Sequence, residues 1–253
     1  MTVYQRLLDC RHRGTKSLAV LVDPDKVDDL AACRRLVRMG VESRVDFFLV
    51  GGSLITGDNF GDVVRLIKEE SEVPVVLFPG SNLHIEPSAD AILFLSLISG
   101  RNPELLIGQH VVAAPVLKRS GMEVLSTGYI LINSGGATTV SYMSNTVPIP
   151  QDKPSVAACT AMAGEMLGLK LIYLEAGSGA GQPIAGKTIR LVRKSVDVPL
   201  IVGGGISDRY KAQRALEAGA DMLVVGNSVE ENPSLLGELG ELMEAYRGER
   251  KVR

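Results

Sequence analysis

Short apolar segments recur along the whole chain, and each is bounded by turn residues. The segments are rich in Val, Ile, Leu and Phe, and they are nearly continuous rather than alternating with polar residues. This pattern is typical of strands that are buried on both faces, as in parallel sheets covered by helices. The sequence therefore predicts eight strands, at residues 17–23, 45–52, 73–80, 91–96, 123–132, 169–177, 198–205 and 220–227.

Segments with a helical period lie between most of the predicted strands. Gly40 is expected to end the first helix, and Ser207 or Asp208 and then Asn232 are expected to cap two later ones. The alternation of strands and helices predicts parallel β–α–β units. The predicted helices are residues 28–40, 59–71, 103–121, 153–168, 187–196, 207–219 and 232–250.

Eight such units favour a single α/β domain, residues 1–253, folded as a TIM (β/α)8 barrel. The chain has 253 residues, which agrees with the roughly 250 residues typical of this fold. An open doubly wound sheet is the alternative. We favour the barrel because there are eight predicted strands and because the phosphate-binding signals described below follow the last two.

Two stretches depart from the regular alternation. Residues 81–90, between the third and fourth predicted strands, are too few for a crossover helix with its loops, which needs at least about 10–12 residues. We therefore predict a modified barrel whose third helix is missing or reduced to a short turn. The stretch 133–152 is rich in Gly, Ser, Thr, Asn and Pro, and it is expected to be a loop over the active site.

Composition and charge narrow the class of protein. The formal net charge is −2 and the pI is about 6.0, so no basic face for nucleic acid is implied. The three cysteines, Cys10, Cys33 and Cys159, have no metal-like spacing and are expected to be reduced thiols. The N-terminus lacks the apolar region of a signal peptide, and no apolar run reaches the ~18 residues of a membrane span. We expect a soluble, cytoplasmic protein, which would meet any lipid substrate through transient contact with the membrane surface or through a carrier.

Glycine-rich turns follow the last two predicted strands, in VGGGI (202–206) and VVGNS (224–228). Glycines there let backbone N–H groups approach an anion closely, and the next helix adds its positive end. Barrels most often hold phosphate at these two turns. A tight connection without a ligand is the alternative for either turn alone. The residues predicted to contribute are Gly203, Gly204, Gly205, Gly226 and Asn227.

The sixth predicted strand ends in YLEAGSGAG (173–181), which carries a carboxylate beside a Gly and Ser run. Glu175 would repel a phosphate, so we expect it to orient or deprotonate a polyol hydroxyl. A surface carboxylate in a flexible loop is the alternative. Tyr173 is as compatible with barrel packing as with a site role. Gly177, Ser178 and Gly179 are candidate phosphate donors.

The first predicted strand ends in LVDPDK (21–26), and Pro24 forces the chain to leave the strand. Asp23 could bind Mg²⁺, which prefers oxygen ligands and often takes one or two carboxylates together with substrate phosphates. Ser53, at the end of the next strand, could be its partner. On spacing alone, Asp23 could equally cap the next helix. Lys26 could contact a diphosphate or point into solvent.

Apolar and small residues end the third and fourth predicted strands, in LFPGS (77–81) and FLSLISGRNP (94–103). A long apolar substrate could lie there, in the space left by the reduced third helix, although such residues are commonly plain core. His84 and His110 are isolated and lack metal-ligand spacing, so we expect structural roles for both.

Seven segments of the chain carry a family resemblance that spans the first to the eighth predicted strand. In chain order they are LVDPDK, FLVGGS, VLFPGS, ADAILFLSLISGRNP, YLEAGSGAG, IVGGGI and MLVVGN. Together they resemble geranylgeranylglyceryl phosphate synthases and their bacterial relatives. The resemblance implies a modified TIM barrel with an extended segment in place of the third helix. It also implies an Mg²⁺-dependent prenyltransferase that joins geranylgeranyl diphosphate, or another polyprenyl diphosphate, to sn-glycerol 1-phosphate, and a dimer or hexamer.

The resemblance also assigns residues. Asp23 and Ser53 match the Mg²⁺ ligands, and Glu175 with Tyr173 matches the residues that hold the attacking glycerol hydroxyl. One branch of the family has a lysine where this chain has Leu21, so the chain fits the other branch and the prenyl chain length stays open. The residues that match the glycerol 1-phosphate site are Tyr173, Leu174, Glu175, Ala176, Gly177, Ser178, Gly179, Gly203, Gly204, Gly205, Gly226 and Asn227.

Two other functions are compatible with the same phosphate-binding turns. One is a phosphate-handling barrel isomerase or synthase of the histidine, tryptophan or thiamine type, which would not need Asp23 and Ser53 as a metal pair. The other is a barrel that binds a phosphorylated metabolite without turnover.

Overall fold

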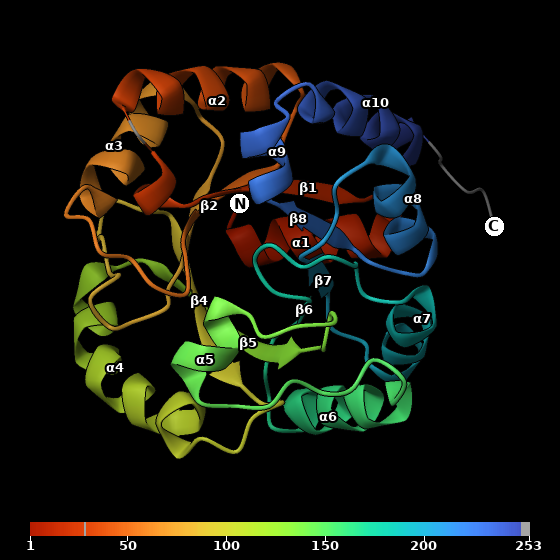
Figure 1. Cartoon of the computed structure of the whole chain (residues 1–253). Coiled ribbons are helices and arrows are strands. Elements are labelled where there is room, and N and C mark those ends of the chain that lie inside the picture. Colours follow the sequence, from red (N-terminus) through yellow and green to blue (C-terminus); the bar gives the residue numbers. More distant parts are fainter. Residues whose placement is uncertain (28, 249–253) are drawn as a thin grey trace.

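Eight parallel strands close into a barrel in the computed structural model, which describes residues 1–27 and 29–248. The strands follow one another around the barrel in chain order, and β8 pairs with β1 to close it (Figure 1). The predicted barrel and all eight predicted strands are confirmed. The strands are β1 (Ser17–Val22), β2 (Phe47–Gly51), β3 (Val75–Phe78), β4 (Ala91–Leu97), β5 (Glu123–Leu131), β6 (Leu171–Glu175), β7 (Leu200–Gly203) and β8 (Met222–Val225).

The continuous apolar runs follow from burial on both faces of each strand. Alternate side chains point into the barrel and out toward the helices. In β6, Leu171 and Tyr173 belong to the interior cluster, whereas Ile172 and Leu174 pack with the surrounding helices. All five residues of β6 are buried, so this strand has no solvent-exposed face.

Most of the helices form an outer ring around the barrel, and three short or terminal ones lie over its ends (Figure 1). Helices α1 and α5 were not predicted, and the last predicted helix is divided into α9 and α10. Residues 249 and 250 of that prediction lie outside the described residues. The helices are α1 (Val3–Arg13), α2 (Leu30–Glu42), α3 (Phe60–Glu70), α4 (Gln109–Ser120), α5 (Thr139–Ser144), α6 (Pro154–Met166), α7 (Gly186–Ser195), α8 (Arg209–Glu217), α9 (Asn227–Glu231) and α10 (Leu235–Gly248), with a 3-10 turn η1 (Pro24–Lys26) and a π-helical turn η2 (Glu104–Gly108).

The third barrel helix is absent, as predicted. Residues 79–90, which connect β3 to β4, contain turns but no helix. One turn is closed by the His84 N–H donating to the Ser81 carbonyl at 3.1 Å, and another by Ala89 N–H donating to the Glu86 carbonyl at 3.1 Å. The outer side of the barrel is therefore thinner here than elsewhere.

Gly40 does not end its helix, so that prediction was wrong. It lies inside α2, and a Cβ built there would come within 2.7 Å of the Phe48 ring. Close packing of the helix on β2, rather than helix termination, explains this glycine. Of the two predicted caps for α8, Asp208 holds the position, since its carboxylate accepts a hydrogen bond from Lys211 N–H at 2.8 Å.

Helix α1 crosses the far end of the barrel in Figure 1, where the strands begin. Val3 and Leu7 pack with the interior cluster. The Glu123 carboxylate, at the start of β5, accepts hydrogen bonds from the backbone N–H groups of Val3 at 2.6 Å and Tyr4 at 3.1 Å. The helix thus closes the amino-terminal end of the barrel. No helix among the described residues is long and apolar enough to cross a membrane.

Three strands are each preceded by an aspartate whose side chain is hydrogen-bonded to the strand before it in the chain. Asp46, Asp90 and Asp221 precede β2, β4 and β8. Their carboxylates accept hydrogen bonds from N–H groups at the starts of β1, β3 and β7. The donors are Leu18, the second residue of β1, at 2.8 Å, and Val75 and Leu200, the first residues of β3 and β7, at 2.8 and 2.9 Å. Each aspartate also pairs with a cation from the helix layer, namely Arg247, Lys68 and Arg193.

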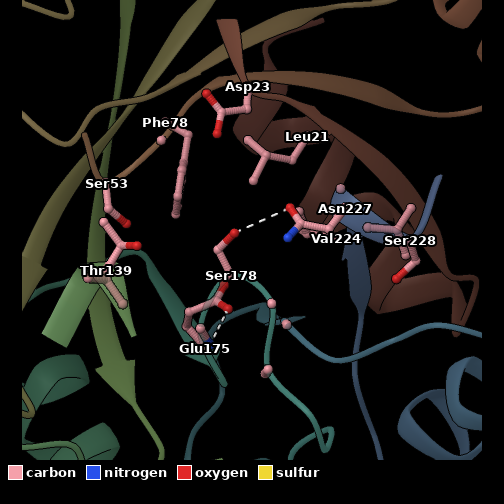
Figure 2. Close-up of a pocket in the computed structure, with 18 of the residues that line it drawn as sticks. Leu21, Asp23, Ser53, Phe78, Thr139, Glu175, Ser178, Val224, Asn227 and Ser228 are labelled. Carbon is pink, nitrogen blue, oxygen red and sulfur yellow. Dashed lines mark hydrogen bonds between the residues drawn. The ribbon is translucent and has the colours of Figure 1, made fainter. Parts of the chain in front are cut away.

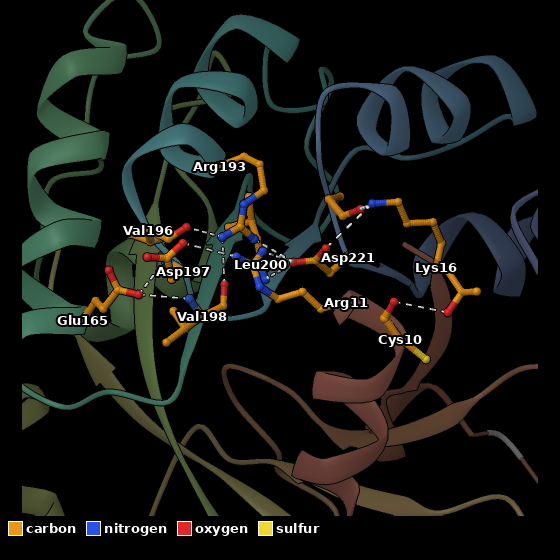
Figure 3. A network of polar contacts seen from close by, with 12 residues as sticks. Cys10, Arg11, Lys16, Glu165, Arg193, Val196, Asp197, Val198, Leu200 and Asp221 are labelled. Atoms are coloured by element: carbon orange, nitrogen blue, oxygen red, sulfur yellow. Dashed lines mark hydrogen bonds and ion pairs between the residues drawn. The ribbon is translucent and has the colours of Figure 1, made fainter. Parts of the chain in front are cut away.

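The Asp221 link is the most buried of the three (Figure 3). Its Oδ2 accepts a hydrogen bond from Arg193 Nη1 at 2.7 Å, and Lys16 Nζ lies 3.7 Å from its Oδ1. Burial lowers the pKa of Arg193, and the Asp221 charge opposes that effect. The neighbouring Asp197 is fully exposed, and its contact with Arg11 is longer, at 3.6 Å.

We predict that Asp221→Asn lowers the free energy of unfolding by about 3 kcal/mol, because it leaves the buried Arg193 charge without a counter-ion. Urea unfolding followed by circular dichroism measures the change. Asp197→Asn is the matched control and should have no measurable effect, since exposed ion pairs contribute little. Equal losses in both variants would contradict the role of burial.

Candidate functional site

A cleft of about 440 Å³ opens at the end of the barrel where the strands finish. Figure 2 shows labelled side chains around it from β1, β3, β6 and β8, from the turns that follow β1, β2, β6 and β8, and from α5. The cleft contains most of the predicted site residues, which come from the ends of β1, β2, β6, β7 and β8 and from the turns that follow them. Those that line the cleft are Asp23, Lys26, Ser53, Tyr173, Glu175, Gly177, Ser178, Gly179, Gly204, Gly205, Gly226 and Asn227.

Three residues assigned to the site do not line the cleft. Leu174 is fully buried and faces the helices, because it alternates with Tyr173 and Glu175 along β6. Ala176 is also buried on that side, and its N–H donates to the Gly203 carbonyl at 3.1 Å. Gly203 lies behind the side chains of Tyr173 and Glu175. These three residues lie behind the lining of the cleft and do not contact its interior.

Glu175 is the buried acidic group of the cleft. It ends β6, and its Oε1 accepts a hydrogen bond from Gly177 N–H at 2.7 Å (Figure 2). Burial raises the pKa of this carboxyl to about 7, against the opposing effects of the Gly177 hydrogen bond and of Tyr173. A group with such a pKa exchanges protons near neutral pH, as a general base or acid must.

The glycines of the β7 turn leave room for that carboxylate. A Cβ at position 203 would lie 2.8 Å from Glu175 Oε2 and 2.5 Å from the Tyr173 hydroxyl. A Cβ at position 204 would overlap Glu175 Oε1 and lie 2.9 Å from Ala176 N. Gly204 also has φ +81°, which favours glycine. The sequence analysis related these glycines to phosphate binding or to a tight connection, and the structure adds this steric reason.

Tyr173 belongs to an aromatic cluster at the floor of the cleft. Its ring centroid lies 5.6 Å from that of Phe78 and 5.3 Å from that of Tyr129. The Tyr173 hydroxyl is buried and has no hydrogen-bond partner among the described residues. It lies on the same side of Gly203 as the Glu175 carboxyl, and Tyr173 lines the cleft. Barrel packing and a site role, which the sequence left open, are therefore compatible.

Asn227 joins three turns at the rim of the cleft. Its Oδ1 accepts hydrogen bonds from Lys26 Nζ, in the β1 turn, and from Ser178 Oγ, in the β6 turn, at 3.2 Å for the latter (Figure 2). The amide NH2 group of Asn227 is then the part left for an anion. Lys26 also pairs with Glu230 at 3.1 Å, so it is held at the rim rather than free in solvent.

Several backbone donors remain available in the two predicted anion-binding turns. Within the described chain, the N–H groups of Gly205, Asn227 and Ser228 donate to no protein acceptor. Ser228 Oγ donates to the Ile206 carbonyl at 2.8 Å and thereby holds the β7 and β8 turns together. Unpaired N–H groups from adjacent turns are well suited to bind a phosphate.

Asp23 lies across the cleft from Glu175, and Ser53 lies at the side of the cleft, next to Thr139 (Figure 2). Asp23 caps the 3-10 turn, with its Oδ1 accepting a hydrogen bond from Asp25 N–H at 3.2 Å. Asp23 therefore caps this turn, whereas the next helix, α2, is capped by Asp29. Asp23 also lines the cleft, and its binding of a metal stays a prediction. Burial raises the pKa of Asp23, and the Asp25 N–H opposes that shift.

Asp25, which the sequence analysis did not assign, links the β1 turn to the β2 turn. Its carboxylate accepts hydrogen bonds from the N–H groups of Thr56 at 2.7 Å and Gly57 at 2.9 Å. This link fixes the chain that follows Ser53. The second acidic residue of DPDK was the available signal for it in the sequence.

Charge in the cleft is mainly negative. Apart from Lys26, its charged lining residues are acidic: Asp23, Asp25, Glu175, Glu230 and Glu231. A substrate with phosphate groups therefore needs additional positive charge here. No group of three or more His, Cys, Asp or Glu that could hold a metal occurs among the described residues. A metal at this site would depend on one carboxylate, hydroxyl groups, water and the substrate's own oxygens.

Helix α5 also reaches the cleft, and the sequence had placed this segment only in a loop. Thr139 and Val140 line the cleft. The Thr138 side chain caps α5 and lies against Gly177, where a Cβ would come within 3.0 Å of the Thr138 Cβ. The signal in the sequence was a Thr–x–x–Ser capping pattern at 138–141, hidden by polar neighbours.

A second, smaller groove lies beside the cleft, where the third barrel helix is absent. It is lined mainly by apolar side chains from the β3–β4 connection, β4, η2 and α4, including Ile85, Leu93, Leu95, Leu105 and Leu117. His110 borders it, with its Nε2 3.1 Å from Ser96 Oγ. The groove is located where the sequence analysis expected an apolar substrate to lie.

Comparisons with known proteins agree over nearly the whole chain. The geranylgeranylglyceryl phosphate synthase of Spirosoma linguale is 58% identical over 240 residues, covering 95% of this chain and 96% of that protein. The enzyme of the same name from Chitinophaga pinensis is 51% identical over 243 residues, covering 96% of each. The crystal structure of (S)-3-O-geranylgeranylglyceryl phosphate synthase from Thermoplasma acidophilum, in complex with sn-glycerol-1-phosphate, has a TM-score of 0.90 at 32% identity and covers 97% of this chain and 99% of its own. Residues 12–244 match the PcrB family, and the chain belongs to that family.

Proposed function

We propose that this protein is a prenyltransferase that joins a polyprenyl diphosphate, such as geranylgeranyl diphosphate, to sn-glycerol 1-phosphate. The products are the 3-O-prenylglyceryl phosphate ether and diphosphate. The observation that carries the proposal is a buried carboxyl, Glu175, with a pKa of about 7, beside two turns with unpaired N–H groups. One small substrate with a phosphate and a hydroxyl can use both features at once.

The phosphate of sn-glycerol 1-phosphate would bind between the β7 and β8 turns. Donors for it are the N–H groups of Gly205, Asn227 and Ser228 and the Asn227 amide. The glycerol would then extend toward Glu175 and the Tyr173 hydroxyl, which face the same cleft. Anchoring the phosphate fixes the attacking hydroxyl at short range and so removes much of the entropy of a bimolecular reaction.

Asp23 and Ser53 fit a magnesium ion that is shared with a diphosphate. One carboxylate and one hydroxyl leave most positions of the ion to water and to phosphate oxygens, which suits Mg²⁺. The negative lining of the cleft also requires a cation before a diphosphate can enter. When bound, Mg²⁺ would supply charge neutralisation of the leaving group.

The prenyl chain would extend from this point into the apolar groove between the β3–β4 connection and α4. A chain of isoprene units has no hydrogen-bonding groups, so it matches a groove lined by Ile85, Leu93, Leu95 and Leu105. Water excluded from this groove cannot capture the allylic carbon as its bond to diphosphate breaks.

The bond changes balance without a further reactant. The allylic carbon–oxygen bond to diphosphate breaks and its electron pair leaves with the diphosphate. The glycerol hydroxyl oxygen forms the new ether bond to that carbon, and Glu175 accepts the hydroxyl proton. The raised pKa of Glu175 makes it a stronger base than an ordinary carboxylate.

Ether formation tests the proposal directly. Purified protein with Mg²⁺, sn-glycerol 1-phosphate and prenyl diphosphates of C15 to C35 should give an ether product, identified by mass spectrometry. The absence of product at every chain length would reject the function. The chain length used fastest also answers the question that the sequence left open.

Glu175→Gln should lower kcat by about 10²–10⁴-fold, because glutamine preserves the shape but cannot accept the proton. The dissociation constant for sn-glycerol 1-phosphate, measured by calorimetry, should change much less. Glu231→Gln, which changes a carboxylate of the cleft lining outside the predicted site residues, is the matched control. An unchanged kcat in Glu175→Gln would remove Glu175 from the chemical step.

The pH dependence follows from the same carboxyl. Because the base must be ionised, kcat/KM should increase with pH and level off above a pKa of about 7. Stability should change in the opposite direction. The pKa is raised in the folded state, so the free energy of unfolding should fall as pH increases from the ordinary carboxyl pKa to about 7. In Glu175→Gln, the decrease in stability over this interval should be lost.

Asp23→Asn should increase the Mg²⁺ concentration needed for half-maximal rate by about 10- to 100-fold, because an amide replaces the anionic ligand. Removal of divalent ions with EDTA should abolish turnover in the unmodified protein. A variant with an unchanged Mg²⁺ requirement would show that Asp23 does not bind the ion.

A further inference from the structure

We propose that the Phe78 ring stabilises the positive charge that develops on the allylic carbon of the prenyl substrate. The inference rests on the proposed function, because this charge arises only as the bond from that carbon to diphosphate stretches. Phe78 ends β3 and lines the cleft. The sequence analysis related this end of β3 only to an apolar substrate. An aromatic ring attracts a cation because its face carries negative charge.

On one side, Phe78 adjoins the turn that is proposed to hold the diphosphate. It pairs with Gly51 in the ladder between β2 and β3, and Gly52 and Ser53 follow directly. A Cβ built at Gly52 would lie 3.4 Å from both carboxylate oxygens of Asp23, so this carboxylate lies against the same turn. The diphosphate would therefore be held close to Phe78.

On the other side, Phe78 adjoins the residues that are proposed to hold the attacking hydroxyl. Its ring centroid lies 5.6 Å from that of Tyr173. A Cβ built at Gly203 would lie 2.5 Å from the Tyr173 hydroxyl and 2.8 Å from Glu175 Oε2, so these two groups border the same space. The carbon that passes from diphosphate to glycerol must move between the two sides. In the view of Figure 2 the Phe78 side chain lies between Asp23 and Glu175.

Two tyrosines hold the Phe78 ring at the floor of the cleft. The Tyr129 ring meets it edge to face, with centroids 5.8 Å apart and an interplanar angle of 72°. The centroids of Tyr129 and Tyr173 are 5.3 Å apart, and all three residues are buried. The chain has only five phenylalanines and six tyrosines, so three rings at one floor are a large share of them. Contacts with two neighbouring rings fix the orientation of Phe78 before a substrate binds.

The chemistry of the charged carbon favours a ring as its neighbour over a carboxylate. Asp23 and Glu175 would also attract a cation, but a carboxylate oxygen in contact with the allylic carbon could form an ester bond to it. A phenyl ring attracts the cation through its π electrons and offers no lone pair. The tyrosine hydroxyls stay protonated, because burial raises the pKa of both Tyr129 and Tyr173 well above the ordinary range.

The floor of the cleft is also shielded from water. Phe78 is 7% exposed and packs with the interior cluster of the barrel. Cation–π contacts contribute most where water does not compete for the cation. A ring that attracts only the developing charge stabilises the transition state more than the neutral prenyl chain of the substrate. Its effect should therefore be on kcat rather than on affinity.

Ring fluorination tests this role while the shape of the side chain is retained. Phe78 is replaced by phenylalanine that carries one, two or three ring fluorines, which withdraw electrons from the ring face in steps. We expect kcat for ether formation to fall with each fluorine, by about 10- to 30-fold over the series, with little change in KM for the prenyl diphosphate. Urea unfolding confirms that each variant is folded. The same series at Phe47, which is buried in the interior cluster but does not line the cleft, is the matched control and should leave kcat unchanged.

Binding of a charged analogue gives a second measurement that does not depend on turnover. Calorimetry compares two analogues of the prenyl diphosphate. One carries a protonated amine in place of the branched allylic carbon, and the other is a thiolodiphosphate with a neutral chain. Three fluorines at Phe78 should weaken binding of the amine by about 10-fold or more and leave binding of the thiolodiphosphate unchanged. Equal weakening of both would show that the ring only packs against the chain, and would overturn the proposal.

The kinetic outcomes separate this inference from the proposed function. A kcat that is constant across the Phe78 series, or that falls equally in the Phe47 series, would overturn the inference. Phe78→Leu removes the π electrons and keeps an apolar side chain, so it should lower kcat about as much as three fluorines do, and a leucine variant as fast as the unmodified protein would contradict the role. If the unmodified protein forms no ether, the proposed function fails. Normal turnover without a response to fluorine rejects the inference alone.

Discussion

The site depends on one unfavourable placement, a carboxyl buried beside two turns that are suited to bind an anion. Glu175 is held there because Gly203 and Gly204 have no side chains in the space that the carboxyl occupies. The Gly177 N–H gives it one hydrogen bond, but burial dominates and its pKa is about 7. The residues at the ends of β6 and β7 therefore depend on each other, because any side chain at position 203 or 204 would displace the Glu175 carboxyl.

The rest of the barrel supports this arrangement by fixing the strands and their turns. Paired aspartates at the amino-terminal end link β1 to β2, β3 to β4 and β7 to β8. At the other end, Asn227 and Asp25 link turns through side chains. Stability is thus concentrated at one end and chemistry at the other, which is the usual division of labour in this fold.

The sequence predicted the architecture well because its signals are local. Eight apolar runs and the short 81–90 connection were sufficient for a barrel without its third helix. The cleft was also largely predicted, because parallel strands bring their ends together whatever the intervening sequence. The wrong predictions concern residues whose role depends on packing. Gly40 was predicted to end a helix, but it is a glycine because the helix packs closely on Phe48 there. Leu174 was assigned to the site, although the alternation of side chains along the strand turns it toward the helices.

Contacts between separate strands and turns could not be predicted from the sequence, for a related reason. Tyr129 lies against Tyr173 only because β5 and β6 pair in the observed register. Helix α5 was hidden because it is one short element within a polar stretch, and Asp25 because its partners are about thirty residues away in another turn. Each of these needs the three-dimensional alignment of two segments, which no single stretch of residues encodes.

The missing third helix has a consequence for where the barrel opens. The ladder between β3 and β4 has only two paired positions, Val76 with Ala91 and Leu77 with Ile92, against seven between β4 and β5. Few ladder bonds and a thin outer cover make such a seam the part of a domain with the smallest free energy of local unfolding. Amide hydrogens along it should exchange with solvent earlier than those of β6 and β7. This seam borders the apolar groove, on the side of the barrel where the proposed prenyl chain would lie.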